Sequence, residues 1–407
     1  MKRYEVIIVG GGASGMIAAA TAGKKLGGEN VLLIEGQQRM GRKLLATGNG
    51  RCNLTNMTAS EKDYYTDDRK ILSAVLSKFG VDDTLRFFSQ IGVETMTEDE
   101  GRVYPLSEQA ASVLDMLRFE IDRRKVCSVT ENAVTSVRKQ GGRFIVIAGE
   151  NRYEGRNVII ACGGCAAIQL GANDSGTKLL ASLGHKILTP SPALTQMKTN
   201  SAYIGALKGM RVDCEASLVK NGKTLYRENG EVLFADGALS GIAVFNLSRF
   251  YEQGASVRLR LLCEKNENEI RSILKDRAIK LNDLTLENYL NGMLNKRVAN
   301  CVLKNAGFSP LSKPVSALSD NDIEKIVRSI CCFDFPVSGL SGWKNAQVTR
   351  GGAVLSQFDE NLQSRICKGL YACGEVLNVD GKCGGYNLQW AWSSGAVCAM
   401  AINRKER

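Results

Sequence analysis

The chain has 407 residues, 44% of them hydrophobic, and its 53 lysines and arginines outnumber its 42 aspartates and glutamates, giving a net charge of +11. This length suits two or three domains, and the charge favours anionic ligands such as dinucleotides, carboxylates or CoA esters. A single histidine excludes a histidine-rich metal site, so we expect no metal, and no stretch offers the roughly 18 apolar residues of a membrane span.

The cysteines and the distribution of charge indicate the cellular location of the protein and the kinds of partner that it binds. Thirteen cysteines without the spacing of a disulfide framework predict a soluble protein in a reducing cytoplasm. The basic residues are dispersed, and the densest clusters, at 123–125 and 404–407, are typical of solvated surfaces. The pattern therefore argues against nucleic acid and membranes as partners, and it leaves the oligomeric state open.

The N-terminal segment carries a dinucleotide fingerprint. Tyr4–Val9 predicts a buried parallel strand, Ser14–Leu26 predicts a helix, and Val31–Ile34 predicts a second strand that ends on an acidic residue. Glycines between the first strand and the helix allow a tight turn and close approach to a pyrophosphate, while the acid can bind ribose hydroxyls. We predict that the dinucleotide site includes Gly10, Gly12, Ala13, Ser14, Gly15, Glu35 and Gly36. This fingerprint does not choose FAD over NAD.

Two further segments favour a flavin. The loop at 41–53 combines basic residues with glycines and can wrap a second phosphate or the isoalloxazine edge, although a solvated basic loop is the alternative. Near the C-terminus, a strand at 370–373 is expected to deliver Gly374 and Glu375, and a helix is expected to begin after Gly385. The N–H groups at that helix start can face the flavin N1 and C2 carbonyl, where reduced flavin carries negative charge.

With both regions considered, the sequence resembles a bacterial flavoprotein family whose signatures run GRKLLxTGNGRCNLTN and GExLDVDGxxGGYNLQxAWSSG, here at 41–56 and 374–395. Further matches at 101–105, 163–164, 183–185, 230–234, 239–241 and 348–352 extend the resemblance over nearly the whole chain. The family includes bile-acid 3-dehydro-Δ4,6-reductases and aminoacetone-oxidase-like enzymes. The resemblance implies non-covalent FAD, and beside Ser14 and Glu35 it implies contacts at Arg42, Lys43, Asn49, Gly50, Asn53, Val134, Gly163, Gly374, Glu375, Gly385, Asn387, Leu388 and Gln389.

The sequence departs from the family pattern at three places. The usual Gly-Gly-x-Ser-Tyr-Pro is replaced by the residues at 163–168, and the usual Leu-Phe-Thr-His is replaced by those at 233–236. Asn378 stands where the second signature has an aspartate. All three departures fall near the expected substrate side, so they concern the substrate more than the cofactor.

The expected fold is α/β, with a Rossmann-like FAD-binding domain of glutathione-reductase type that contains an inserted β-barrel and a helical subdomain. Because the flavin site needs both ends of the chain, we expect residues 1–190 and 340–407 to fold together. Alternating residues and an Asn221-Gly222 hairpin signal predict a β-barrel or sandwich at 191–262. Apolar residues at helical spacing predict a helical insert at 263–339.

Several other chemical readings are weaker. Cys162 and Cys165 have the spacing of a redox pair, but the intervening glycines are expected to pass close to FAD, so whether these cysteines are redox-active stays open. His185 is expected in a loop or in the core rather than in a catalytic triad. A second GxGxxG is missing, so NADH or NADPH would have to dock transiently as co-substrate.

The preferred interpretation is an FAD-dependent oxidoreductase that uses NAD(P)H to reduce conjugated C=C bonds in an oxo compound, such as a 3-oxo-4,6-diene bile acid. A hydride would pass from FAD N5 to the β-carbon, while an acid protonates the neighbouring carbon. Candidates for this acid, or for a donor to the carbonyl, are Tyr386, Tyr104, Arg51 and Ser240. The alternatives are an amine or aminoacetone oxidase that produces hydrogen peroxide, and a flavin-carrying RNA-associated or binding protein.

Overall fold

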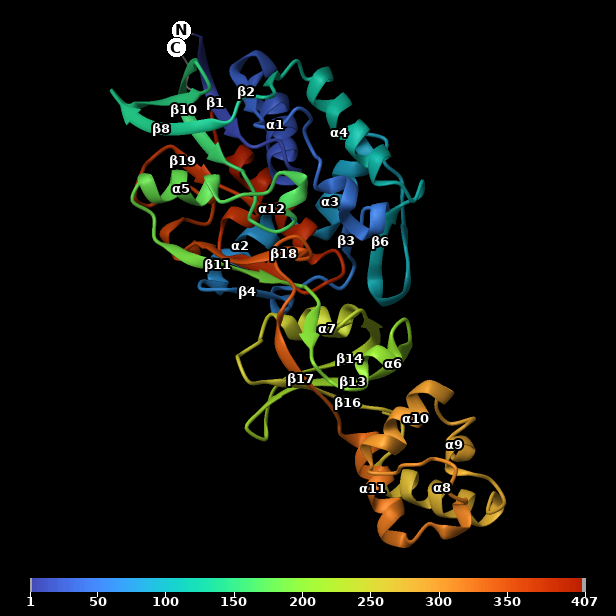
Figure 1. The fold of residues 1–407 in the computed structure, drawn as a ribbon. Helices are drawn as coiled ribbons and strands as arrows, with labels where there is room; N and C mark the ends of the chain where they lie inside the picture. Colours follow the sequence, from blue (N-terminus) through green and yellow to red (C-terminus); the bar gives the residue numbers. More distant parts are fainter. Residues whose placement is uncertain (1, 405–407) are drawn as a thin grey trace. The chain divides into compact units, whose positions relative to one another are not determined.

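The computed structural model describes residues 2–404, so positions 405–407 of the basic C-terminal cluster lie outside the described residues. The chain, drawn in Figure 1, divides into two compact units. Each unit has a hydrophobic core of its own. Unit 1 comprises residues 1–192 and 346–407, and unit 2 comprises residues 193–345. The boundaries predicted from the sequence are at 190 and 340.

A seven-stranded sheet forms the centre of unit 1, with the strand order β7-β2-β1-β10-β9-β8 and with β19 paired to β10. Strands β7, β2, β1, β10 and β19 run parallel, whereas β9 pairs antiparallel with both β10 and β8. Pairing of β19 with β10 brings the returning C-terminal segment into the N-terminal sheet. The strands are β1 (Arg3–Val9), β2 (Val31–Ile34), β7 (Cys127–Val129), β8 (Val134–Gln140), β9 (Arg143–Ala148), β10 (Asn151–Ile160) and β19 (Leu370–Ala372).

Helices α1 and α12 pack against each other in unit 1 (Figure 1). Helix α12 is apolar around much of its circumference because α1, α2, α3 and β3 contact it. Its two tryptophans, Trp390 and Trp392, are buried. The helices of this unit are α1 (Ala13–Leu26), α2 (Arg69–Lys78), α3 (Val81–Gln90), α4 (Ala110–Arg123), α5 (Ser175–Ser182) and α12 (Tyr386–Ala401).

Three small sheets and several 3₁₀ turns complete unit 1. The sheets pair β3 (Thr55–Asn56) with β6 (Arg102–Pro105) and β5 (Thr95–Thr97), β4 (Tyr64–Thr66) with β20 (Val379–Gly381), and β11 (Ile187–Ala193) with β18 (Val348–Ala353). The 3₁₀ turns lie at Gly28–Asn30, Leu44–Gly50, Glu61–Asp63, Asp99–Gly101, Ile168–Leu170, Leu355–Gln357 and Gly374–Val376.

Unit 2 contains a closed antiparallel barrel with the strand order β12-β15-β14-β13-β16-β17. The Asn221-Gly222 hairpin signal is confirmed: these residues connect β13 and β14 with φ angles of 51° and 76°, as a tight hairpin turn requires. The fold class predicted from the sequence is therefore confirmed. The strands are β12 (Met197–Thr199), β13 (Arg211–Lys220), β14 (Lys223–Ala235), β15 (Ala238–Ser240), β16 (Ser256–Arg260) and β17 (Phe333–Leu340).

The helical part of unit 2 lies mainly between the adjacent barrel strands β16 and β17, which corrects the predicted helical insert at 263–339. Residues 333–339 are not helical, because Phe333 and Phe335 point into the barrel core and Asp334 pairs with Arg258 on β16 at 2.7 Å. This period-two alternation was missed in the sequence. The helices are α6 (Ile204–Leu207), α7 (Ile242–Ser248), α8 (Glu267–Lys280), α9 (Leu286–Tyr289), α10 (Lys296–Asn305) and α11 (Asp320–Cys331), with a 3₁₀ turn at Val315–Ala317.

Candidate functional site

The glycine loop between β1 and α1 combines tight packing with one open face. A Cβ built on Gly10 would lie 2.5 Å from the Ala161 carbonyl oxygen, and one built on Gly15 would lie 1.9 Å from the Gly10 carbonyl oxygen. A Cβ on Gly12 would meet nothing within 4 Å. Helix α1 begins after Gly12 with no side-chain cap and no acidic residue in its first turn. Its free N–H groups are therefore available to a phosphate.

Glu35, the residue that follows β2, binds the glycine loop through its side chain. Its carboxylate accepts hydrogen bonds from the N–H groups of Gly11 and Gln37, each at 2.7 Å. Gly36 then comes close to Ala133, where a Cβ on Gly36 would lie 3.4 Å away, so the start of β8 at Val134 lies near the same edge. The structure thus gathers the predicted ribose acid and the predicted adenine neighbour at one end of the sheet.

The basic loop at 41–53 contacts both halves of the site. Arg42 donates to the Gln37 side chain at 2.9 Å, and the Lys43 ammonium lies 2.7 Å from the Glu375 carboxylate. The other Glu375 oxygen accepts the Thr349 N–H at 2.7 Å. Residues 49 and 50 are exposed. Lys43 and Glu375 were both predicted as FAD contacts, and the structure joins them to each other.

The C-terminal half packs on the start of α1 through small residues. A Cβ on Gly374 would lie 2.5 Å from the Ser14 hydroxyl oxygen, and one on Gly395 would lie 2.3 Å from the Ser14 carbonyl oxygen. The Ser394 hydroxyl accepts the Gly374 N–H at 2.9 Å. These contacts hold the turn after β19 and the middle of α12 against the glycine loop.

Helix α12 provides a second uncapped helix start. It follows Gly385, which has a φ of 99°, and it has no side-chain cap and no acidic residue in its first turn. The Asn387 carboxamide contacts the Gly381 N–H and carbonyl at 2.8 and 3.0 Å, so it holds the preceding turn. Leu388 is half-buried, and Gln389 is fully buried with its amide hydrogen-bonded inside the protein. The first-turn N–H groups remain available to an acceptor.

Thr349 is a residue of this site that sequence reasoning did not single out. Its hydroxyl accepts the N–H groups of Cys165 and Ala166 at 2.8 and 3.1 Å, and it lies 2.4 Å from where a Cβ on Gly164 would be. This contact fixes the turn that follows β10, in which Gly163 has a φ of 73° and open space around it. The family match at 348–352 contained the signal, but no role was assigned to it.

The residues predicted from the sequence as the catalytic acid or as the donor to the carbonyl are distributed over both units. In unit 1 the Arg51 guanidinium lies 4.1 Å from the centre of the Tyr104 ring and pairs with Glu98 and Glu108. Burial raises the pKa of Tyr104, so its phenol stays protonated at neutral pH. The Tyr386 hydroxyl lies 3.4 Å from the Thr58 hydroxyl. Ser240 is buried on β15 of unit 2.

The cysteine pair and the histidine take different environments. Cys162 and Cys165 are free thiols, and burial raises the pKa of Cys162 to about 12 and also raises that of Cys165. A thiol with so high a pKa is a poor nucleophile near neutral pH. His185 is buried, stacks on Phe358 and lies 2.8 Å from the Ser364 hydroxyl, which confirms the expected core position.

Asn378 stands where the family signature has an aspartate. Its contact with Asp67 explains why an asparagine is favoured at this position. Its amide donates to the Asp67 carboxylate at 2.7 Å, and the same carboxylate accepts the N–H groups of Leu355 and Ser356 at 3.1 and 3.0 Å. Burial by itself raises the pKa of Asp67, but these hydrogen bonds outweigh it and hold that pKa below its usual value. An ionised aspartate at position 378 would face Asp67 with like charge.

We expect Asn378→Asp to lower the melting temperature at pH 7.5 by several degrees, because two carboxylates would share one partly buried site. One of them then has a raised pKa, so the folded variant binds a proton that the unfolded chain does not. The difference in melting temperature between this variant and the parent protein should therefore become smaller as the pH falls toward 5. Thermal scans at both pH values measure this. Asn378→Ala is the control, and an equal deficit for Asn378→Asp at both pH values would contradict the explanation.

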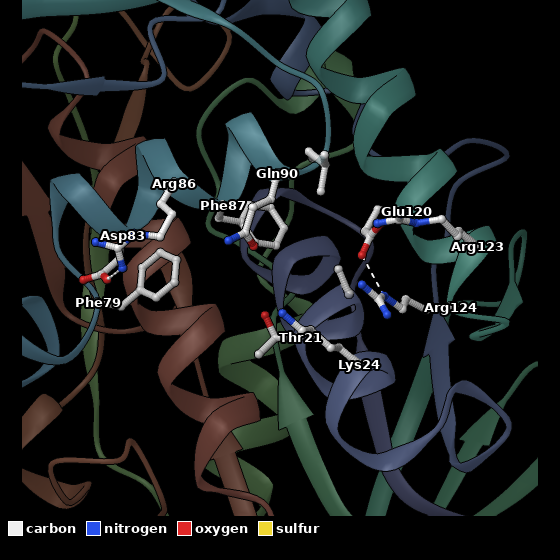
Figure 2. A pocket seen from close by; sticks show the side chains of 12 residues that line it. Thr21, Lys24, Phe79, Asp83, Arg86, Phe87, Gln90, Glu120, Arg123 and Arg124 are labelled. Atoms are coloured by element: carbon white, nitrogen blue, oxygen red, sulfur yellow. Dashed lines mark hydrogen bonds and ion pairs between the residues drawn. The ribbon is translucent and has the colours of Figure 1, made fainter.

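A separate cavity of about 200 Å³ lies among α1, α3 and α4 (Figure 2). Figure 2 shows Lys24, Phe87 and the ion pair between Glu120 and Arg124 around it. None of its lining residues belongs to the glycine-lined site. Within residues 2–404, no group of three or more His, Cys, Asp or Glu side chains is arranged to hold a metal ion. No helix in that part of the chain is long and apolar enough to cross a membrane.

The two open helix starts, the glycine cradle and the acid after β2 fit an FAD molecule, and together with the fold they define an FAD-dependent oxidoreductase of the Rossmann class. The family model described as HI0933-like protein Rossmann domain matches residues 4–401. The chain belongs to this HI0933-like family, which confirms the resemblance seen in the sequence.

Curated relatives cover nearly the whole chain. The 3-dehydro-bile acid Δ(4,6)-reductase of Clostridium scindens is 35% identical over 401 residues, which cover 97% of this chain and 98% of the relative. The ribosomal RNA dihydrouridine synthases of Escherichia coli and Haemophilus influenzae are 29% and 27% identical over 405 and 415 residues. The alignments cover 99% and 100% of this chain and 98% and 100% of those relatives.

Solved structures support the fold at low identity. The 3-ketosteroid Δ1-dehydrogenase of Sterolibacterium denitrificans matches with a TM-score of 0.53 and 14% identity, covering 99% of each chain. The 3-ketosteroid-Δ4-(5α)-dehydrogenase of Rhodococcus jostii matches with a TM-score of 0.50 and 14% identity, covering 99% of this chain and 97% of that one. At this identity the likeness concerns the fold alone.

Proposed function

We propose that this protein reduces a C=C bond conjugated to a carbonyl group, with NADH or NADPH as the electron donor. The observation that carries the proposal is an FAD-type cradle in a chain whose curated relatives are named for adding hydrogen across such a bond. The Δ4 and Δ6 bonds of a 3-oxo steroid are conjugated to its carbonyl. Dihydrouridine differs from uridine by two hydrogens at a C=C bond that is conjugated to the C4 carbonyl.

The proposed FAD contacts follow from the site. The start of α1 would hold the pyrophosphate, Glu35 the ribose, and the start of α12 the flavin N1 and C2 carbonyl. The remaining proposed contacts are Gly10, Gly12, Ala13, Ser14, Gly15, Gly36, Arg42, Lys43, Asn49, Gly50, Asn53, Val134, Gly163, Gly374, Glu375, Gly385, Asn387 and Leu388. Gln389 is left out of this set, because its side chain is fully buried and its amide is bonded inside the protein. Lys43, Glu375 and Asn387 also have protein partners, so the backbone N–H groups of the two helix starts are the strongest part of the set.

FAD held at this site would supply the hydride chemistry that links the reduced nicotinamide to the β-carbon of the substrate. The protein must then protonate the neighbouring carbon and polarise the carbonyl. Tyr104 is the first candidate for proton donation because the Arg51 guanidinium lies 4.1 Å from the centre of its ring, where it favours the phenolate that donation leaves and partly offsets the rise in pKa that burial causes. Tyr386 and Ser240 remain the other candidates. The balance is one hydride from the nicotinamide and one proton added across the C=C bond.

A bile-acid 3-oxo-4,6-diene is the first substrate candidate. It is supported by the 35% identity to the Clostridium scindens reductase over nearly the full length of both chains. The departures from the family pattern at 163–168 and 233–236 are the positions to exchange if a different enone is preferred, whereas the contact with Asp67 accounts for the third departure, Asn378.

A uracil base in ribosomal RNA is the second candidate. It is supported by two relatives from two other species and by the net charge of +11, which suits a polyanion. The dispersion of the basic residues argued against nucleic acid at the level of sequence, and these relatives reopen that question.

An anaerobic spectral titration tests the proposal. We expect NADH or NADPH to bleach the purified yellow protein, and one substrate to restore the oxidised spectrum: either a 3-oxo-4,6-diene bile acid or ribosomal RNA transcribed without modification. Mass spectrometry should then show a gain of two hydrogens in that substrate. Bleaching by aminoacetone with peroxide formation and no response to either nicotinamide would instead favour the oxidase alternative. Retention of RNA without turnover would favour a binding protein.

A further inference from the structure

Asn53, Leu54 and Thr55, which lie in the first family signature at 41–56, bind α12 or the residue before it. Helix α12 begins within the second signature, at 374–395. The Asn53 carboxamide satisfies its neighbours when its nitrogen faces the carbonyls of Val103 and Thr55 and its oxygen accepts the Gly385 N–H at 3.3 Å. The Trp392 indole donates to the Leu54 carbonyl at 2.9 Å. The Thr55 hydroxyl donates to the Gln389 carboxamide at 2.6 Å. Residues 53–55 are thus tied to the residue that precedes α12, to the first turn of the helix and to its second turn.

Gln389 is the centre of this contact. Its side chain is fully buried, and its amide nitrogen donates to the hydroxyls of Thr84 and Ser393, each at 2.9 Å. Those hydroxyls donate in turn to the carbonyls of Gly80 and Phe79. Because both hydroxyl protons are already committed, the Gln389 amide can take only one orientation. Its oxygen must therefore face Thr55.

The backbone of Gln389 also holds the first turn of α12 in place. The Gln389 N–H makes the first helical hydrogen bond, to the Gly385 carbonyl at 3.0 Å. The Thr55 carbonyl oxygen lies 2.4 Å from where a Cβ on Gly385 would be, so β3 and the helix start are in close contact. The field of a helix terminus acts mainly within its first turn, so a small displacement there changes its effect on a nearby charge.

We propose that Gln389 is a positioning residue that sets the reduction potential of the bound flavin, without touching it, by fixing the start of α12 against β3. This inference deepens the proposed function and rests on the FAD site described above. Reduced flavin carries negative charge near N1, so a correctly placed helix start stabilises the reduced form and raises the potential. Loosening the helix start lowers the potential.

The test is a spectroscopic measurement of the midpoint potential in the FAD-loaded full-length protein, without substrate. Gln389→Met keeps the length of the side chain but removes all three hydrogen bonds. We expect its affinity ratio for reduced over oxidised FAD to fall about tenfold, which corresponds to about 30 mV for a two-electron couple. Thr55→Val removes only the Thr55 link and keeps the other two bonds of Gln389. It should shift the potential in the same direction by a smaller amount, and the double variant should shift no further than Gln389→Met.

Trp392→Phe is the matched control, because it removes a hydrogen bond to the same segment from the next turn of the same helix. We expect it to lower the melting temperature without moving the potential. The proposal is wrong if Thr55→Val and Gln389→Met lose thermal stability but keep the parent potential, since Gln389 would then be structural only. If Gln389→Met does not fold, the midpoint potential of Thr55→Val alone tests the proposal. Failure of the proposed substrates leaves this measurement unaffected, whereas a protein that binds no FAD would overturn the proposed function itself.

Discussion

Gly15→Ala is expected to abolish FAD binding and to unfold the protein at a markedly lower temperature. Its Cβ would lie 1.9 Å from the Gly10 carbonyl oxygen and 3.3 Å from the Ala161 side chain. Neither neighbour can yield easily, because Gly10 itself packs on the backbone at Ala161. Overpacking of this kind costs about 3 kcal/mol or more. The measurements are the FAD content of the purified protein, from its absorbance, and the melting temperature with and without added FAD.

Gly12→Ala separates cofactor binding from folding. Gly12 has a φ of −79°, which alanine adopts without strain, and a Cβ there would meet nothing within 4 Å. We therefore expect the FAD-free variant to melt like the FAD-free parent but to bind FAD roughly 100-fold more weakly, because the methyl group would occupy space proposed for the pyrophosphate. Normal FAD affinity in this variant would place the pyrophosphate elsewhere.

Glu35→Gln is expected to weaken FAD binding by roughly tenfold to 100-fold while leaving the fold intact. The Glu35 carboxylate accepts two backbone N–H groups, from Gly11 and Gln37, at 2.7 Å. A carboxamide of the same shape has only one oxygen, so its NH₂ group must face one of these donors. Hydrogen bonds to charged groups contribute about 1.5–3 kcal/mol, and the proposed bonds to the ribose weaken as well. Equilibrium titration of the FAD-free protein with FAD, followed by flavin fluorescence, measures the change.

Glu29→Gln provides the control for charge alone. Glu29 lies between α1 and β2 of the same unit, and its side chain contacts Asn30 at 3.0 Å rather than the glycine loop. Removing this charge should leave FAD affinity unchanged. If Glu29→Gln and Glu35→Gln weaken binding equally, the effect of Glu35 is one of net charge, and its proposed contact with the ribose is wrong.

The sequence was sufficient for features that depend on short-range patterns. Strand β1, the glycine loop, α1 and β2 follow each other within 34 residues, so period, glycine spacing and the terminal acid identify them together. The hairpin at Asn221-Gly222 is likewise local, because its two φ-positive positions favour those residue types. The family signatures also mark the two segments, at 41–56 and 374–395, that the structure brings into contact.

Features that depend on distant partners could not be predicted. The strand β17 closes a barrel with residues more than 70 positions earlier, and an intervening helical segment hid its alternation. Gln389 reads as a polar residue of a flavin signature, yet its amide is used by Thr55 and Thr84, more than 300 positions away. The partner of Lys43 is Glu375, and either residue alone reads as a ligand contact. Such pairings follow from the packed structure, because nothing local selects the partner.

The late pairing of β19 with β10 also has a consequence for biosynthesis. Strand β10 ends at Ile160 and β19 begins at Leu370, so roughly 200 residues are translated in between, which takes on the order of 10–40 seconds at about 5–20 residues per second. Throughout that interval the last part of one edge of β10, at Val158–Ile160, has no neighbour, because β9 pairs only with Asn151–Gly155, and the face of α1 that later packs on α12 is exposed to solvent. Nascent chains of this protein are therefore expected to engage chaperones until residues 370–401 leave the ribosome, whereas ribosome-held chains of increasing length should acquire FAD only after that point.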